Sequence, residues 1–360
     1  MKKICAVVLL LCLLLCACSS APETAESSSP AATPTPAPVS SAAAPTATPE
    51  PTLAPTPTAE PTAAYWNPLT GEPLDEPHTS RLYAVTINNV WVSLPHYGLN
   101  EADIFFEMLV NDYATRGLAL FADPSDVGTI GSVRSMRYNF TALCVSYDAI
   151  IAHAGGVQEV IDDMKARGVN NLNADTTYFF RDEARLNAGY DYEHTLFVKG
   201  EDLPKYAEDK GYRTENEAGT QYGLTFAEDV VLDGETAEFI NFRFWGNYRG
   251  MDYDAESDMY AYWHSDEVSL DGGTGEPELF KNVLLLHMEI VDTDGFHLAQ
   301  HIGEGDGYYA CGGKLVPIRW NHASHEEPFV FTYADGTPLN LEVGRSYIGF
   351  VPVENEISWE

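Results

Sequence analysis

A low-complexity segment near the start of the chain, Ser19 to Ala64, confines folding to the residues that follow it. The segment consists almost entirely of Ala, Pro, Thr, Ser and Glu, has no aromatic residue, Lys or Arg, and holds half of the 22 prolines. Such a composition cannot bury an apolar core, and its spaced prolines favour an extended polyproline II chain. We therefore expect a disordered linker over residues 18–64 and a folded body from Tyr65 to Glu360.

The residues before this linker resemble the signal peptide of a bacterial lipoprotein. Lys2 and Lys3 precede an apolar run, Ile4 to Leu15, which is shorter than the roughly 20 residues that span a bilayer. Ala17 and Cys18 then resemble a lipobox, so we predict a signal peptide over 1–17 and a lipid such as palmitate on Cys18. The alternative is an ordinary secretory signal that is cut nearby. Lipidation predicts a membrane anchor on the outer face of the cytoplasmic membrane of a Gram-positive cell.

Charge and cysteine usage limit the partners and the cross-links of the chain. The formal net charge is −34, which repels phosphate backbones and makes nucleic acid an unsuitable partner. The excess is compatible with simple solubility at an acidic surface or with attraction of divalent cations. Of six cysteines, only Cys144 and Cys311 lie in the folded body, both among apolar neighbours. We predict two buried free thiols there rather than a disulfide.

In the first part of the folded body, strand and helix patterns alternate. Period-2 or continuous apolar runs predict strands, and longer periodic runs predict helices. The expected strands are Leu82 to Asn88, Ala102 to Val110, Arg116 to Ala122 and Ala149 to His153, and the expected helices are Ser135 to Ser146 and Val157 to Arg167. This alternation indicates an α/β domain over 65–235, whose polar end, Ala207 to Glu235, holds the boundary.

The second part is rich in short β-forming segments separated by turn signals such as Asp271-Gly272. The expected strands are Phe239 to Trp245, Met259 to His264, Asn282 to Val291 and Ser346 to Val353. Their spacing predicts a mainly antiparallel β-rich C-terminal domain over 236–360. The whole protein is then of the α+β class.

Arginine usage in the first part points to an anion. Between Tyr65 and Met164 the basic residues other than histidine are all arginines: Arg81, Arg116, Arg134 and Arg137. Arg134 and Arg137 follow a glycine turn at an expected helix start, and Ser132 or Ser135 could cap that helix. The free N–H groups of a helix start and the planar guanidinium groups of arginine both bind carboxylate or phosphate. An anion-binding pocket fits this motif. The alternative is a structural network in which both arginines pair with carboxylates such as Glu107 and Asp103.

A second motif, His153-Ala154-Gly155-Gly156, ends an apolar strand where ligand crevices open in α/β sheets. His153 could be a general base, a metal ligand, an anion donor or hydrogen-bonded scaffolding. The glycines lack the remaining residues of a dinucleotide or P-loop fingerprint, so we expect no nucleotide cofactor. Arg181 and His194 could join the same cleft. No closely spaced histidine pair lies there to support zinc. His297 and His301 are four residues apart, but the glycines around them predict a strand and loop, so we expect no metal.

The motifs occur in an order similar to that of the YerB family of bacterial lipoproteins, which have N- and C-terminal domains of unknown function. The resemblance covers Tyr65 to Pro352 and rests on Asn67-Pro68-Leu69-Thr70-Gly71, on residues Gly131 to Arg137, on His153 to Gly156 and on Phe180-Arg181-Asp182. It implies that the arginine and histidine motifs belong to the N-terminal domain, and it implies no established activity. The chain departs from the family pattern at Thr195, where Asn is expected, and at Ser346-Tyr347.

Three functional hypotheses follow. In the first, the protein is a binding module for an anionic envelope ligand such as a peptidoglycan stem carboxylate or another anionic wall polymer. In the second, it is an envelope-acting enzyme with His153 as general base and Arg134 and Arg137 stabilising negative charge, although no nucleophile is evident. In the third, it is a protein-docking scaffold. The candidate ligand-binding residues are Glu107, Arg116, Arg134, Arg137, His153, Gly155, Gly156, Arg181 and His194. The ligand and the oligomeric state are left open by the sequence.

Overall fold

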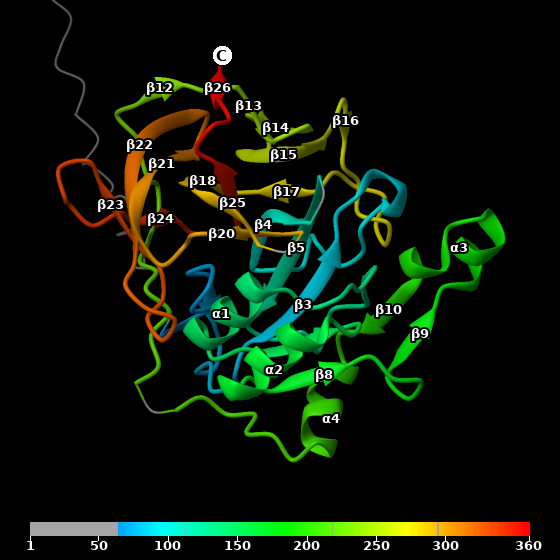
Figure 1. The fold of residues 1–360 in the computed structure, drawn as a ribbon. Coiled ribbons are helices and arrows are strands. Elements are labelled where there is room, and N and C mark those ends of the chain that lie inside the picture. Colours follow the sequence, from blue (N-terminus) through cyan, green and yellow to red (C-terminus); the bar gives the residue numbers. More distant parts are fainter. Residues whose placement is uncertain (1–63, 112, 218, 294) are drawn as a thin grey trace, which may run out of the picture. The chain divides into compact units, whose positions relative to one another are not determined.

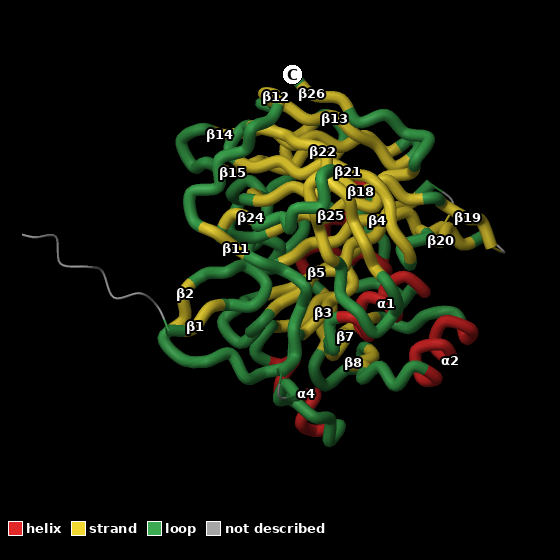
Figure 2. Tube along the Cα trace, turned by 90° about the vertical axis from the view of Figure 1, so that its left-hand side faces the viewer, coloured by secondary structure: helices red, strands yellow, loops and turns green. Residues whose placement is uncertain are grey.

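The computed structural model describes residues 64–111, 113–217, 219–293 and 295–360. This part of the chain contains 26 strands, four α-helices and two 3-10 helices, and Figure 2 shows how far strands predominate over helices. The predicted signal peptide, the lipidation site at Cys18 and most of the predicted linker lie outside the described residues. None of the helices described is both long enough and apolar enough to cross a membrane.

A thirteen-stranded sheet forms the centre of the folded body (Figure 1), with the strand order β12-β22-β21-β18-β25-β4-β5-β3-β7-β8 and with β19, β20 and β23 attached to it. Its strands from the first half of the chain are β3 (Tyr83–Asn88), β4 (Ile104–Asn111), β5 (Ala114–Phe121), β7 (Ile150–His153) and β8 (Asn171–Asn173). Those from the second half are β12 (Glu235–Thr236), β18 (Asn282–Met288), β19 (Ile290–Thr293), β20 (Phe296–Ala299), β21 (Gly303–Cys311), β22 (Lys314–His322), β23 (Val330–Tyr333) and β25 (Ser346–Pro352).

Strand β25 joins the two halves of the chain. It pairs in parallel with β4 on one edge, where Ser346 is opposite Ile104, and in parallel with β18 on the other. All its residues are buried, as expected for a strand covered on both faces. The sheet therefore crosses the boundary that we predict near residue 235, so the two sequence domains share one sheet.

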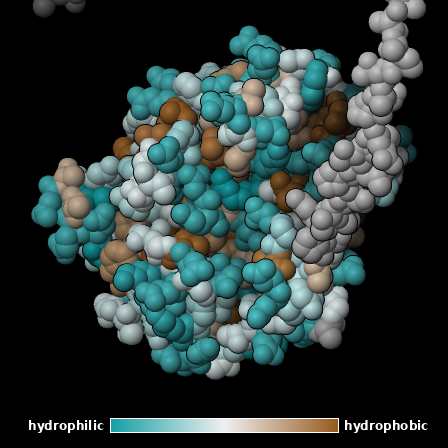
Figure 3. Space-filling view, turned by 180° about the vertical axis from the view of Figure 1, so that it is seen from behind, coloured by the Kyte–Doolittle hydropathy of each residue, from teal (hydrophilic) through white to brown (hydrophobic). Residues whose placement is uncertain are grey.

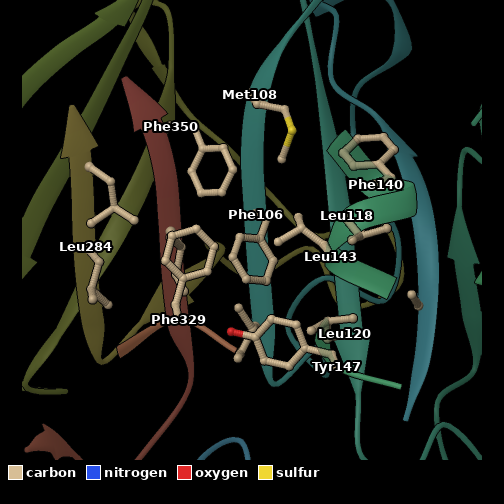
Figure 4. Close-up of a cluster of buried hydrophobic side chains, with 14 of the residues drawn as sticks. Phe106, Met108, Leu118, Leu120, Phe140, Leu143, Tyr147, Leu284, Phe329 and Phe350 are labelled. Atoms are coloured by element: carbon tan, nitrogen blue, oxygen red, sulfur yellow. The ribbon is translucent and has the colours of Figure 1, made fainter. Parts of the chain in front are cut away.

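The two faces of the central sheet are covered by different layers. Alternate residues of β4 point to opposite faces. Phe106 and Met108 belong to a cluster with helix α1 (Tyr138–Ser146), and Figure 4 shows them beside Phe140 and Leu143 of that helix. Phe105 faces a second, six-stranded sheet. That sheet consists of β13 (Phe239–Phe244), β14 (Asn247–Asp254), β15 (Met259–His264), β16 (Glu267–Val268), β17 (Leu279–Phe280) and β26 (Ser358–Trp359).

The remaining elements border these layers. Helix α2 (Gln158–Ala166) connects the parallel strands β7 and β8. A three-stranded sheet has the order β6-β10-β9. The other elements are β1 (Tyr65–Trp66), β2 (Pro73–Leu74), η1 (Trp91–Ser93), β6 (Thr129–Gly131), β9 (Phe179–Arg181), α3 (Glu183–Ala188), η2 (Tyr192–His194), β10 (Leu196–Lys199), α4 (Asp202–Asp209), β11 (Phe226–Ala227) and β24 (Leu341–Glu342).

Each strand expected from the sequence is present, and the fold is richer in sheet than an alternating α/β domain would be. The stretch expected as one strand from Asn282 is divided into β18 and β19. The helix expected from Ser135 begins only at Tyr138, because Arg137 is extended and makes no side-chain cap. The expected caps at Ser132 and Ser135 were wrong.

Both thiols of the folded body are buried and free, as predicted for Cys144 and Cys311. Burial raises the pKa of Cys144, and it raises that of Cys311 to about 11. Thiols with raised pKa values are poor nucleophiles.

Candidate functional site

The segment from Ser132 to Met136 is held rigidly at one end of the strands β3 and β7. The Asn88 backbone N–H donates to the Ser132 carbonyl at 2.9 Å, and the Val133 N–H donates to the Leu196 carbonyl at 2.7 Å. The Arg134 backbone N–H donates to the Thr86 carbonyl at 3.1 Å, and the Met136 N–H donates to the Gly155 carbonyl at 2.9 Å. Because β3 and β7 are parallel, their carboxyl ends meet at one edge of the sheet, and this segment crosses that edge. The sequence thus places its arginine motif on a fixed backbone.

Arg116 reaches the same place from strand β5, where it is opposite Asn88 of β3. Its side chain is buried, with 3% of the residue exposed. One guanidinium nitrogen, Nη1, donates to the Ser135 carbonyl at 3.0 Å, whereas the buried Nε meets no acceptor. Among the residues that the structure describes, no ion pair includes Arg116, and the carboxylate that acts on its charge is Glu193, which pairs with Arg134.

Arg134 and Arg137 complete a group that we call the arginine cluster: Arg116, Arg134 and Arg137. Arg137 donates to the Met136 carbonyl at 2.9 Å and to Asn111 Oδ1 at 3.0 Å, both of them neutral acceptors. Arg134 pairs with Glu193 at 3.3 Å, and the side chain of Glu193 is 56% exposed. The Nε atoms of both arginines are buried and have no partner.

The positive charges of the cluster act on one another. Burial lowers the pKa of Arg116 well below its ordinary value, the charges of Arg137 and Arg134 lower it further, and the charge of Glu193 offsets only part of this. Burial and the charge of Arg134 lower the pKa of Arg137 to about 10. All three groups still carry their charge at neutral pH as ordinary guanidinium chemistry dictates. One exposed carboxylate thus faces three guanidinium groups, which leaves an excess of positive charge in a protein of net charge −34.

His194 borders the arginine cluster, and Arg181 does not contact it. His194 is buried, its Nδ1 lies 2.7 Å from Asn88 Nδ2, and its pKa is lowered by burial and by the charge of Arg134 among others. Arg181 donates to the Tyr192 carbonyl at 2.6 Å and lies 3.8 Å from the centroid of the Tyr192 ring. The structure thus brings together four of the candidate residues: Arg116, Arg134, Arg137 and His194.

His153, Gly155 and Gly156 are scaffolding for the arginine segment. The exposed fraction of His153 is 0%, and its ring nitrogens lie 2.8 Å from the Gly155 carbonyl and 3.3 Å from Asn171 Oδ1. Burial lowers its pKa. Gly155 adopts a positive φ of 68° and donates to Asn173 at 2.8 Å. A general base needs access to its substrate, so the hypothesis that pairs His153 with Arg134 and Arg137 in catalysis is wrong in its geometry.

Glu107 lies in a different network, within the core. Its carboxylate accepts from Arg249 Nε at 2.9 Å, from the Tyr262 hydroxyl at 2.8 Å and from the Tyr347 hydroxyl at 2.6 Å, with 0% of the residue exposed. Asp103 accepts from Asn67 and from the Ala122 backbone. Neither carboxylate pairs with Arg134 or Arg137, so these two partners were predicted wrongly, and Arg134 pairs with a different carboxylate, Glu193. Glu107 was also wrong as a ligand contact, because it is buried in the core.

A cleft with a volume of about 820 Å³ was not predicted from the sequence. Its walls come from the loop after β3, from the end of α3 and from the loop after β15, which lie on the same side of the folded body in Figure 1. His194 and His264 both line it. On the face seen in Figure 3, by contrast, hydrophobic residues lie in small separate groups.

No group of three or more His, Cys, Asp or Glu within the described ranges could hold a metal ion. The arginine cluster suits an anion rather than a cation, because guanidinium groups only donate hydrogen bonds.

Comparison with known proteins shows the family. The descriptions "Protein of unknown function (DUF3048) N-terminal domain" and "Protein of unknown function (DUF3048) C-terminal domain" match residues 69–213 and 240–348. The chain is 28% identical over 298 residues to a protein of Bacillus subtilis (strain 168) named "Putative lipoprotein YerB", covering 79% of this chain and 86% of that one. The crystal structure of YerB protein from Bacillus subtilis superposes with a TM-score of 0.71 at 25% identity, covering 81% of this chain and 99% of that one. The chain belongs to this two-domain family of unknown function.

Proposed function

We propose that the protein is a lipid-anchored, extracytoplasmic binding protein whose arginine cluster holds an anionic group of an envelope ligand. The lipobox at Cys18 and the name of the Bacillus relative support the anchor. The proline-rich linker would hold the folded body away from the membrane, where wall material is within reach.

The buried charge of Arg116 carries this proposal. A cation without an ion-pair partner of its own is costly to bury, and two more guanidinium groups, which share the single carboxylate of Glu193 with it, increase the cost. A bound carboxylate or phosphate would neutralise the cluster and accept hydrogen bonds from Arg134 and Arg137, which are partly exposed. The repulsion among the guanidinium groups, which destabilises the fold, would then be relieved on binding and would contribute to the affinity for an anion.

Carboxylate and phosphate share the chemistry that the cluster recognises, so the test uses one probe of each kind. Isothermal titration calorimetry on the full-length protein in detergent would compare N-acetyl-D-alanyl-D-alanine, for a stem-peptide carboxylate, with glycerol 3-phosphate, for a phosphate-bearing polymer. At least one probe should bind saturably. Arg137→Gln should weaken that binding by about tenfold or more, the equivalent of about 1.4 kcal/mol.

The matched control is Arg319→Gln. Arg319 lies on the surface, where it pairs with Asp306 at 2.8 Å and Glu304 at 3.6 Å, far along the chain from the cluster. Its loss should leave the affinity unchanged. The proposal fails if neither probe binds, or if Arg137→Gln and Arg319→Gln have equal effects.

A further inference from the structure

The cleft of about 820 Å³ beside His264 has a chemistry unlike that of the arginine cluster. No Lys or Arg is among the described residues that line it, whereas Asp191, Glu267 and Asp271 are. Neither Asp191 nor Glu267 forms an ion pair with any described residue, and both are exposed. The cleft therefore repels anions and offers acceptors to hydrogen-bond donors.

Two buried polar atoms in the wall of this cleft lack partners. His264 is 3% exposed, and its Nε2 lies 3.2 Å from the Asn89 carbonyl, which can only accept. The proton of the neutral ring is therefore on Nε2, and Nδ1 is an acceptor without a donor. Burial and the charge of Arg249 lower the pKa of His264 to about 2, so the ring stays neutral. The hydroxyl of Ser269, also 3% exposed, has no partner either.

The other walls are apolar and aromatic. Trp91 is 48% exposed, and its ring centroid lies 6.0 Å from that of His264. Tyr190 also lines the cleft, and its hydroxyl donates to the Leu94 carbonyl at 2.9 Å, which holds the ring in place. An indole face next to carboxylate and imidazole acceptors suits a ligand that has an apolar face and several hydroxyl groups. The volume lies within the range of about 300 to 1,000 Å³ that is usual for small-ligand sites.

From this geometry we infer that the cleft is a saccharide-binding site for a neutral sugar, with a ring stacked on Trp91 and hydroxyls that donate to His264 Nδ1 and Glu267. An alkyl ammonium group could also meet the carboxylates. An ammonium group has its donors at one point, so it would leave His264 Nδ1 and the Ser269 hydroxyl without hydrogen-bond partners. A ligand with several hydroxyl groups could reach all of these atoms, and this favours a polyol. The inference is independent of the proposed anion site.

Fluorescence titration and calorimetry on the full-length protein would test it with three probes: maltotriose, tri-N-acetylchitotriose and 1,4-diaminobutane. At least one trisaccharide should bind saturably and change tryptophan emission. Trp91→Ala should weaken that binding by about tenfold or more, and Glu267→Gln should weaken it by several-fold. Because Trp91 is exposed, its replacement should leave the fold intact.

Two controls locate the site. Trp66 is 52% exposed and does not line the cleft, so Trp66→Ala should bind sugar normally. Arg137→Gln should also bind sugar normally while losing the anion, which separates this inference from the proposed function. The inference is overturned if neither trisaccharide binds, if only the diamine binds, if Trp91→Ala binds as well as the wild type, or if Arg137→Gln abolishes sugar binding.

Discussion

Replacing Glu107 with Gln should destabilise the protein severely although the two side chains have nearly the same shape. Glu107 is the carboxylate partner of the Arg249 guanidinium, at 2.9 Å, and the exposed fractions of the two side chains are 0% and 1%. Burial alone would lower the pKa of Arg249, but the charge and hydrogen bond of Glu107, together with Tyr262 and Tyr347, outweigh burial and raise it. Glu107→Gln would leave Arg249 charged in the core without a counterion.

The magnitude follows from that loss. Removing one partner of a buried ion pair costs about 3 to 5 kcal/mol, because the remaining charge stays desolvated. The hydroxyls of Tyr262 and Tyr347, at 2.8 and 2.6 Å, would also lose a charged acceptor. Little cavity forms, so the electrostatic cost should dominate. With a urea m-value of about 3 kcal/mol/M, the unfolding midpoint should fall by about 1 to 2 M.

Urea unfolding of the full-length protein, followed by tryptophan fluorescence, would measure this shift. Arg319→Ala removes a surface ion pair and should change the free energy of unfolding by at most about 1 kcal/mol. The double variant Glu107→Gln/Arg249→Met removes both buried charges and should be less destabilised than the sum of the single variants. A midpoint for Glu107→Gln within the error of the wild type would refute this account of the core.

Three further predictions concern other parts of the fold. If glycerol 3-phosphate is the anion that binds, it should stabilise the wild type against unfolding by about 2.7 kcal/mol at one hundred times its Kd. It should not stabilise Arg137→Gln at that concentration. Thermal unfolding of both proteins with and without the anion measures this. Burial lowers the pKa of His322 to about 4. The unfolded state therefore takes up the proton first, near pH 6.5, so stability should fall as the pH falls from about 6.5 to 4, by at most about 1.4 kcal/mol per pH unit. His322→Gln should show a shallower fall between pH 7 and pH 5 in urea unfolding. Gly117→Ala would place its Cβ 2.0 Å from Phe105 Cε2 and should cost about 1 to 3 kcal/mol. Gly128→Ala meets nothing within 4 Å, so equal urea midpoints for the two alanine variants would contradict the packing argument.

The sequence alone determined the elements whose signals are local. Strand β15 has the bounds expected from the sequence, Met259–His264, because alternation of side chains along a strand is written in neighbouring residues. Two buried free thiols were likewise predictable from their apolar neighbours. The sequence also identified Arg116, Arg134 and Arg137 as unusual, since the stretch from Tyr65 to Met164 contains arginines but no lysine.

Only the tertiary structure decided which groups meet. Glu107 pairs with Arg249, 142 residues away, instead of with the nearer arginines, and among the described residues Arg116 is buried without an ion-pair partner of its own. Strand β25 pairs with β4 across the sequence boundary, and three distant segments enclose the cleft at His264. An apolar pattern fixes which face of a strand is buried but not which edge it pairs with. The partner of a buried charge, and the surroundings of a histidine, depend on that choice of neighbours.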